Sequence, residues 1–159
     1  MLFLLATPEY NNIQSNTTKV RVHLRSGVAE IFDQHQDLMG KVENNIVEIE
    51  TNFENRIQKS FFVLQDAVFI VSNQGLDPNA EKKGTGVYVY ARRAKELTSN
   101  LSIEEFTKQY EQKNSQLEIE NQKLAETPND RALASKTLLL EDEVEFLRRV
   151  VTIAKGFKA

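Results

Sequence analysis

The spacing of the apolar residues changes once along this chain, close to Ala91, and this change constrains the fold more than any other feature. Before Ala91 the apolar residues recur at every second position. Val20, Val22 and Leu24 would share the buried face of a strand, and His23 would lie on the wet face. After Ala91 they recur every seven residues, as on a helix that packs against another helix. The sequence therefore predicts a β-domain followed by a helical segment.

The first part, expected to span residues 1–91, is typical of an antiparallel β-sandwich. Five apolar residues open the chain and predict a buried strand that ends near Pro8. Further runs rich in β-branched and aromatic residues are separated by turn-forming residues, the spacing expected of a sandwich. These runs occupy residues 45–51, 60–65, 67–72 and 86–91. Residues 73–86 are polar, contain three glycines and predict a long exposed loop within a hairpin.

The second part, residues 92–159, predicts an antiparallel helical hairpin. Residues 92–97 suggest a short helical turn, and long helices are expected over about 101–126 and 131–155. Asn100 or Ser102 would cap the first of them. The first helix carries the apolar stripe Ile103, Tyr110, Leu117 and Leu124. The second carries Leu133, Leu140, Leu147 and Ala154, with Thr137, Val144 and Val151 beside them.

Composition excludes several classes of function. The chain has 20 Lys and Arg against 23 Asp and Glu, a net charge of −3, whereas a nucleic-acid-binding protein needs a basic surface. It has no cysteine, so disulfides, thiolate chemistry and cysteine-ligated zinc are excluded. The opening apolar run is too short to cross a bilayer and lacks the basic start of a signal peptide, so we expect no targeting segment there.

One histidine stands between two carboxylates, as Asp33, His35 and Asp37, within the stretch GVAEIFDQHQDLMG at 27–40. In a strand the three side chains would share one face, but one imidazole and two carboxylates in a turn are a poor metal-ligand set. The chain shows no glycine-rich phosphate loop and no nucleophile paired with a base. We therefore expect no catalytic, metal-binding or nucleotide-binding residues and no cofactor.

Charge is uneven along the second helix. Residues 141–145, EDEVE, include four acidic residues, and residues 148–158 include four basic residues and no acidic one. The four basic residues, which we call the basic tip, are Arg148, Arg149, Lys155 and Lys158. Two interpretations stay open: the cations complement the dipole at the helix C-terminus, or they dock on an acidic partner.

Several short motifs occur in a characteristic order. They are Thr7, Pro8 and Glu9 after the first strand; Gly27, Ile31, His35 and Leu38; Phe69 and Val71 within residues 63–73; and YARRAKEL at 90–97. In this order they resemble the epsilon subunit of F-type rotary ATP synthases, called delta in mitochondria. That family has a TPE-like motif, a segment of the form G-x-x-G-I-L-P-N-H-A-P-L, a GGF-x-x-V segment and an A-x-x-A exit into two helices.

The chain also departs from the family. Glu30 replaces the second glycine, and Asp33 and Gln34 replace the Pro-Asn pair. Gln65 and Asp66 stand where the family has paired glycines. Some bacterial members bind ATP through a motif of the form I/L-D-x-x-R-A, whose aspartate and arginine are missing from LSIEEF here, so we expect no ATP binding.

The resemblance implies a non-catalytic subunit whose sandwich joins the gamma subunit to the c ring and transmits torque. The turn facing gamma and the c ring would be formed by Ile31, Phe32, His35 and Leu38. The hairpin would regulate ATP hydrolysis, reaching the alpha and beta subunits through the basic tip. The chain would be peripheral to a membrane, on the side of the catalytic head, in a bacterium, plastid or mitochondrion. The alternative is a stand-alone interaction module with a coiled-coil arm.

Overall fold

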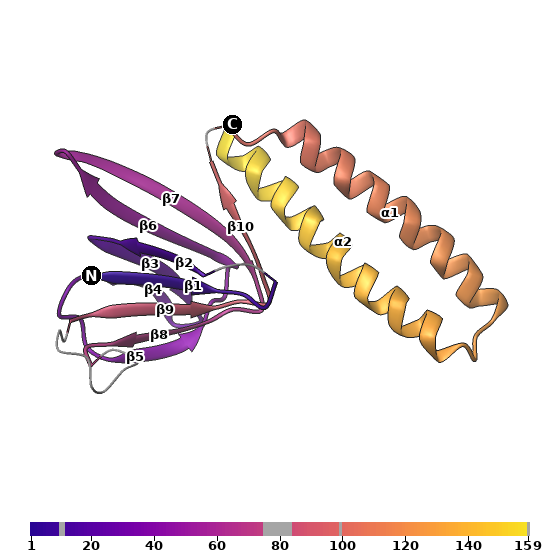
Figure 1. The fold of residues 1–159 in the computed structure, drawn as a ribbon, viewed down its shortest axis with the longest axis horizontal. Helices are drawn as coiled ribbons and strands as arrows, with labels where there is room; N and C mark the ends of the chain where they lie inside the picture. The colour runs from indigo at the N-terminus through magenta and orange to yellow at the C-terminus, as the bar shows by residue number, and fades with distance from the viewer. Residues whose placement is uncertain (10–11, 75–83, 99, 159) are drawn as a thin grey trace. The chain divides into compact units, whose positions relative to one another are not determined.

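The computed structural model describes residues 1–9, 12–74, 84–98 and 100–158. The chain divides into two compact units, Met1–Thr98 and Ser99–Ala159. The first is a β-sandwich and the second is a hairpin of two helices (Figure 1), which confirms the predicted fold class. Most of the expected loop at 73–86 lies outside the described residues, between the end of one strand at Ser72 and the start of the next at Gly86.

The sandwich consists of two five-stranded sheets. The first sheet has the order β2 (Ile13–Asn16), β1 (Leu2–Ala6), β9 (Gly86–Tyr90), β8 (Val68–Ser72) and β5 (Leu38–Lys41). The second has the order β10 (Arg93–Leu97), β7 (Arg56–Gln65), β6 (Ile46–Phe53), β3 (Lys19–Leu24) and β4 (Gly27–Ile31). Neighbouring strands are antiparallel except β1 and β9, which pair in parallel.

The expected helical turn at residues 92–97 is wrong. These residues form β10, which pairs with β7 from Arg93 opposite Gln65 to Leu97 opposite Phe61. Arg, Ala, Lys, Glu and Leu all favour helices, but without β10 the backbone groups along one edge of β7 would lack strand partners. The sandwich unit consequently ends at Thr98 rather than at residue 91.

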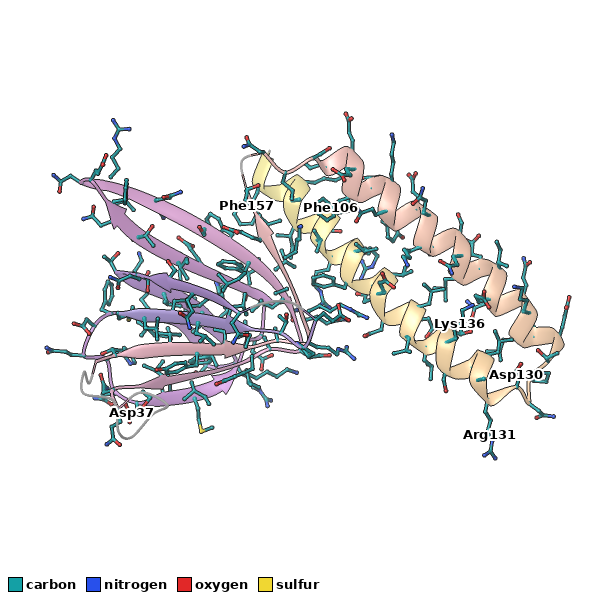
Figure 2. The ribbon with its side chains drawn as sticks, viewed as in Figure 1. Asp37, Phe106, Asp130, Arg131, Lys136 and Phe157 are labelled. Atoms are coloured by element: carbon teal, nitrogen blue, oxygen red, sulfur yellow. The ribbon has the colours of Figure 1, made fainter. Side chains whose placement is uncertain are left out.

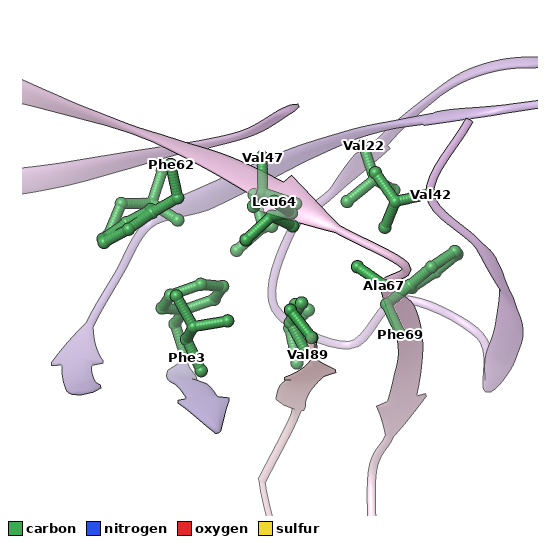
Figure 3. Close-up of a cluster of buried hydrophobic side chains, with 14 of the residues drawn as sticks. Phe3, Val22, Val42, Val47, Phe62, Leu64, Ala67, Phe69 and Val89 are labelled. Atoms are coloured by element: carbon green, nitrogen blue, oxygen red, sulfur yellow. The ribbon is translucent and has the colours of Figure 1, made fainter. Parts of the chain in front are cut away.

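The core of the sandwich lies between the inner faces of the two sheets (Figure 3). Phe3 on β1 stacks on Phe62 on β7, with ring centroids 5.8 Å apart, so this aromatic pair joins the sheets directly. Other fully buried members are Val20, Val22, Val47, Leu64, Ala67, Phe69, Val87 and Val89. The inner strands β1, β3, β6, β7, β8 and β9 each give alternate residues to this core, as the two-residue spacing predicts.

The hairpin consists of α1 (Ile103–Glu126) and α2 (Arg131–Lys158). Ser102 caps α1 by accepting a hydrogen bond from the Glu105 backbone N–H at 3.2 Å. Asp130, at the start of α2 in Figure 2, accepts one from the Leu133 N–H at 3.0 Å. Both helices therefore begin at side chains that satisfy backbone groups of the first turn.

Ion pairs between the helices set their register. Lys136 Nζ on α2 lies 3.2 Å from Glu120 Oε1 on α1, and Lys113 Nζ lies 3.4 Å from Glu143 Oε1. The two pairs are two turns apart on each helix, in opposite directions, as an antiparallel arrangement requires. Glu120 is buried and is also 3.7 Å from Lys123, so two cations compensate its charge.

The predicted apolar stripes occupy the more buried positions of the helices. On α2 the buried members are Thr137, Leu140, Val144, Val151 and Ala154. Phe146 and Val150 are also buried, although the predicted stripes do not contain them. On α1 the stripe residues are half-buried, and Glu120 is the one fully buried residue of the helix. The contact between the helices is thus narrow and partly ionic.

Candidate functional site

The segment between β4 and β5, residues 32–37, contains the histidine that the sequence singles out; we call it the β4–β5 turn. It crosses from the second sheet to the first, because β4 and β5 belong to different sheets. Ile31 ends β4 fully buried, and Leu38 opens β5 packed against the core. Within the turn, the His35 N–H donates to the Phe32 carbonyl at 3.1 Å. Both ends of the turn are therefore anchored in the core.

Side chains from distant segments hold the turn in place. Thr85 Oγ1, just before β9, accepts from the Gln34 N–H at 2.6 Å and donates to Asn73 Oδ1 at 2.6 Å. The Asn73 side-chain amide donates to the His35 carbonyl at 2.6 Å and to Asp37 Oδ1 at 2.9 Å. The Asn73 backbone N–H also donates to Asp37 Oδ1, at 3.0 Å. These bonds fix a turn in which Gln34 has the uncommon φ of +64°.

The side chains of His35 and Asp37 make hydrogen bonds that hold the turn. His35 Nδ1 lies 2.7 Å from the Gln36 carbonyl, so that nitrogen carries the proton and donates it. Asp37, visible at the end of the sandwich in Figure 2, accepts a hydrogen bond from the Asn73 side chain. Asp33 is exposed to solvent. Among the described residues, no three His, Asp or Glu side chains come together as metal ligands.

Two exposed aromatic side chains lie at this end of the sandwich. Phe32 is 51% exposed at the start of the turn. Ile31 and Ile49 both pair with Val20, so the chain beyond β4 and the tip of the β6–β7 hairpin leave the second sheet at the same end. That tip carries exposed Phe53. Aromatic side chains on a fixed, solvent-facing turn are typical of a protein interface.

The basic tip is partly neutralised within its own helix. Arg148 Nε donates to Glu145 Oε2 at 3.0 Å, and the Arg149 guanidinium lies 3.9 Å from the same carboxylate. The hydrogen bond from Arg148 lowers the pKa of Glu145, and the same bond raises the pKa of Arg148. Lys155 is exposed on the last turns of α2, and the side chain of Lys158 lies outside the described residues.

Sequence reasoning did not single out Asn73 and Thr85. They lie near the two ends of the polar segment 73–86, and polar residues next to buried strands are common. What gives them a role is their contact with the β4–β5 turn, and Asn73 is 38 residues from His35 in the chain. No local pattern records a contact of that kind.

Comparison with known proteins gives one kind of match. No family model and no curated protein sequence matches the chain. Among solved structures, the chain is similar to a chain in the cryo-EM structure of the Euglena gracilis mitochondrial ATP synthase, OSCP/F1/c-ring in rotational state 1. The identity is 15%, the match covers 94% of this chain and 79% of that chain, and the TM-score is 0.49. The likeness is one of chain trace alone.

Proposed function

We propose that this chain is a non-catalytic central-stalk subunit of a rotary F-type ATP synthase, the epsilon subunit or its mitochondrial delta equivalent. The β4–β5 turn carries the proposal. Its flanking residues Ile31 and Leu38, together with His35, are those that resemble the family's partner-facing segment. In this chain that segment is a turn held from outside by four hydrogen bonds, with Phe32 exposed on it.

Transmission of torque needs a stiff body with fixed contact points. The sandwich supplies stiffness through two hydrogen-bonded sheets that close on one core. The turn supplies a fixed contact point, because Asn73 and Thr85 order it before any partner arrives. Ordering in advance reduces the conformational entropy that binding costs. In the proposed role the turn contacts the c ring and the foot of the gamma subunit.

The helical hairpin is proposed to regulate ATP hydrolysis. A regulatory element needs two packings that differ by only a few kcal/mol. The ion pairs Lys136–Glu120 and Lys113–Glu143 join the two helices, so in the proposed role the hairpin moves between two packings as one unit. The basic tip would then contact acidic groups of the alpha and beta subunits. Glu145 weakens that tip, because Arg148 and Arg149 already lie against its carboxylate.

The proposed location is peripheral, on the membrane side that holds the catalytic head, in a bacterium or an organelle. Neither helix, over its described residues, combines the length and the apolarity that a bilayer crossing requires. In the proposed role, attachment runs through the c ring and gamma.

Affinity capture tests the proposal. The full chain, tagged, is captured from cells of its source organism, and the partners are identified by mass. The expected partners are the gamma, alpha and beta subunits and the c ring. A stand-alone interaction module would instead be recovered without any of these subunits, and that result would reject the proposal.

A further inference from the structure

A cleft opens at one edge of the sandwich, where the end of β3 faces β5. The two strands belong to different sheets, so no strand pairing closes the gap between them. The cleft has a volume of about 410 Å³, is open to solvent, and is lined by residues 24–26, 38–41 and 43. The turn that contributes residues 25 and 26 precedes β4, whereas the β4–β5 turn follows it. The cleft is therefore separate from the candidate contact described above.

The floor of the cleft is apolar. Leu24 and Leu38 are half-buried and pack against the sandwich core. Gly40 brings the backbone of β5 close to Leu24, because a Cβ at this glycine would lie 3.3 Å from Leu24 Cδ2 and 3.2 Å from Phe69 Cε1. Met39, which is 73% exposed, also lines the cleft. A hydrocarbon group in the cleft would therefore contact the edge of the core and leave water, which favours its binding.

The rim of the cleft is charged. Arg25 lies in the two-residue turn between β3 and β4, and Lys41 ends β5, so each sheet supplies one cation. Glu43 is the third charged residue, and its backbone N–H donates to the His23 carbonyl at 2.8 Å. The side chains of Arg25, Lys41 and Glu43 are all exposed. Two cations and one carboxylate leave the rim with an excess of positive charge.

The cations of the rim are unpaired. On the outer face of the second sheet, by contrast, Lys19 Nζ lies 3.0 Å from Glu50 Oε1. In the part of the chain that the structure describes, neither Arg25 nor Lys41 has an ion-pair or side-chain hydrogen-bond partner, and Glu43 forms no ion pair with either. An apolar cleft with unpaired cations at its mouth matches a ligand that has an apolar chain and an anionic end.

We propose that the cleft binds a fatty acid, a monocarboxylate with a hydrocarbon chain of medium length. The chain lies on Leu24 and Leu38, and the carboxylate accepts hydrogen bonds from Arg25 and Lys41. The fork of N–H groups on arginine matches the two oxygens of a carboxylate. Since a cavity of roughly 150 Å³ holds benzene, the cleft has room for roughly eight to ten carbon atoms and an open mouth.

A membrane surface is the other source of acyl chains with anionic ends. Attraction to anionic lipids selects a cluster of several Lys and Arg residues. The rim has two cations and a carboxylate that opposes them, and the floor is recessed between two sheets. A single free acid fits this arrangement better than a lipid surface does.

Titration of the isolated full chain with octanoate tests the site. The chain is labelled with ¹⁵N, octanoate is added below the concentration at which it forms micelles, and the amide resonances are followed by NMR. Saturable shifts are expected in the β3–β4 turn and in β5. Octanol has the same chain without the charge, so it should bind at least roughly 3-fold more weakly.

Two arginines provide a matched control. Arg25 and Arg56 are both exposed and both lie at hairpin turns of the second sheet, but Arg56 is at the tip of the β6–β7 hairpin and outside the cleft. Either substitution by glutamine changes the net charge equally. Arg25→Gln is expected to weaken octanoate binding roughly 3- to 5-fold, the range of an exposed ion pair, and Arg56→Gln to leave it unchanged. Glu43→Gln should tighten binding, because it removes the opposing carboxylate.

Each other outcome overturns the inference. Octanoate that causes no saturable shift in the cleft would do so, as would equal affinity for octanol and octanoate, or equal weakening by Arg25→Gln and Arg56→Gln. Phosphatidylglycerol vesicles that shift the cleft resonances when octanoate does not would assign the cleft to a membrane surface. If Arg25→Gln does not fold, Lys41→Gln decides by the same criterion. The titration contains no other subunit, so its result is independent of the proposed function.

Discussion

At the scale of single residues, Asn73 orders the β4–β5 turn from outside it. Its side chain bonds to His35, Asp37 and Thr85 at once, all within 2.9 Å. When such a half-buried amide is removed, each of its partners loses a hydrogen bond. The resulting loss of folding free energy is larger than that of one average hydrogen bond.

Replacing Asn73 by alanine is therefore expected to lower the free energy of unfolding by about 1–3 kcal/mol. Urea denaturation followed by circular dichroism measures it. Gln74→Ala, at the exposed neighbouring position, is the control and should change the free energy by less than about 0.5 kcal/mol. Equal effects of the two substitutions would show that the network does not stabilise the fold.

Glu50 makes stability depend on pH. The hydrogen bond with Lys19 is the main cause that lowers the pKa of Glu50, with Lys59 adding to it. Because the folded pKa is depressed, Glu50 stabilises the protein above the pKa of the unfolded chain, and this contribution is lost as pH falls through the folded pKa. The wild type should therefore exceed Glu50→Gln in stability at pH 7, and the difference should shrink on acidification.

Denaturant titrations of both proteins between neutral and acid pH measure this difference. Glu54→Gln, in the exposed turn between β6 and β7, is the matched control for the loss of one carboxylate outside this ion-pair cluster. A difference between wild type and Glu50→Gln that stays constant down to acid pH would contradict the assignment.

At the scale of elements, the strands that the sequence predicts are the inner ones. β1, β3, β6, β7, β8 and β9 all have apolar runs or a clear alternation. The four that it misses, β2, β4, β5 and β10, are the four edges of the two sheets. Edge strands have a neighbour on one side only and carry more polar residues, so the two-residue period fades. β10 is the extreme case, because its residues favour a helix and only pairing with β7 makes it a strand.

Pairing of β10 with β7 predicts where the sandwich can be cut. A fragment of residues 1–98 is expected to be soluble, rich in β-structure and cooperative in thermal unfolding. A fragment of residues 1–91 removes all of β10, so it should melt at lower temperature and aggregate more readily. Circular dichroism melts of the two fragments provide the measurement. If both melt alike, β10 adds nothing to the sandwich.

The hairpin should act on activity rather than on assembly. Deleting residues 99–159 removes both helices together. Deleting α2 alone would instead leave α1 without its partner helix. Under the proposed function, the truncated chain still joins gamma and the c ring, and ATP hydrolysis by the complex rises. Hydrolysis rates of complexes that contain the full or the truncated chain test this. An unchanged rate at low and high salt would make the hairpin a passive element.

At the scale of the whole molecule, the sequence predicts a sandwich followed by a hairpin, and the structure confirms it. The residues singled out from the sequence, Ile31, Phe32, His35 and Leu38, lie in or beside one ordered turn, and their contact with a partner stays a prediction. The sequence does not predict what orders that turn. The ordering of the turn depends on which strands become neighbours. Strands far apart in the sequence can pair, as β1 (Leu2–Ala6) does with β9 (Gly86–Tyr90).

The central claim is that this chain links gamma to the c ring. Its most direct test is the amount of c ring that co-purifies with the alpha, beta and gamma subunits when the chain is present, absent or replaced by Phe32→Asp. The account predicts full retention with the wild type, loss without it, and marked loss with Phe32→Asp, whose exposed position should leave the fold intact. Equal retention of the c ring with and without the chain would contradict it.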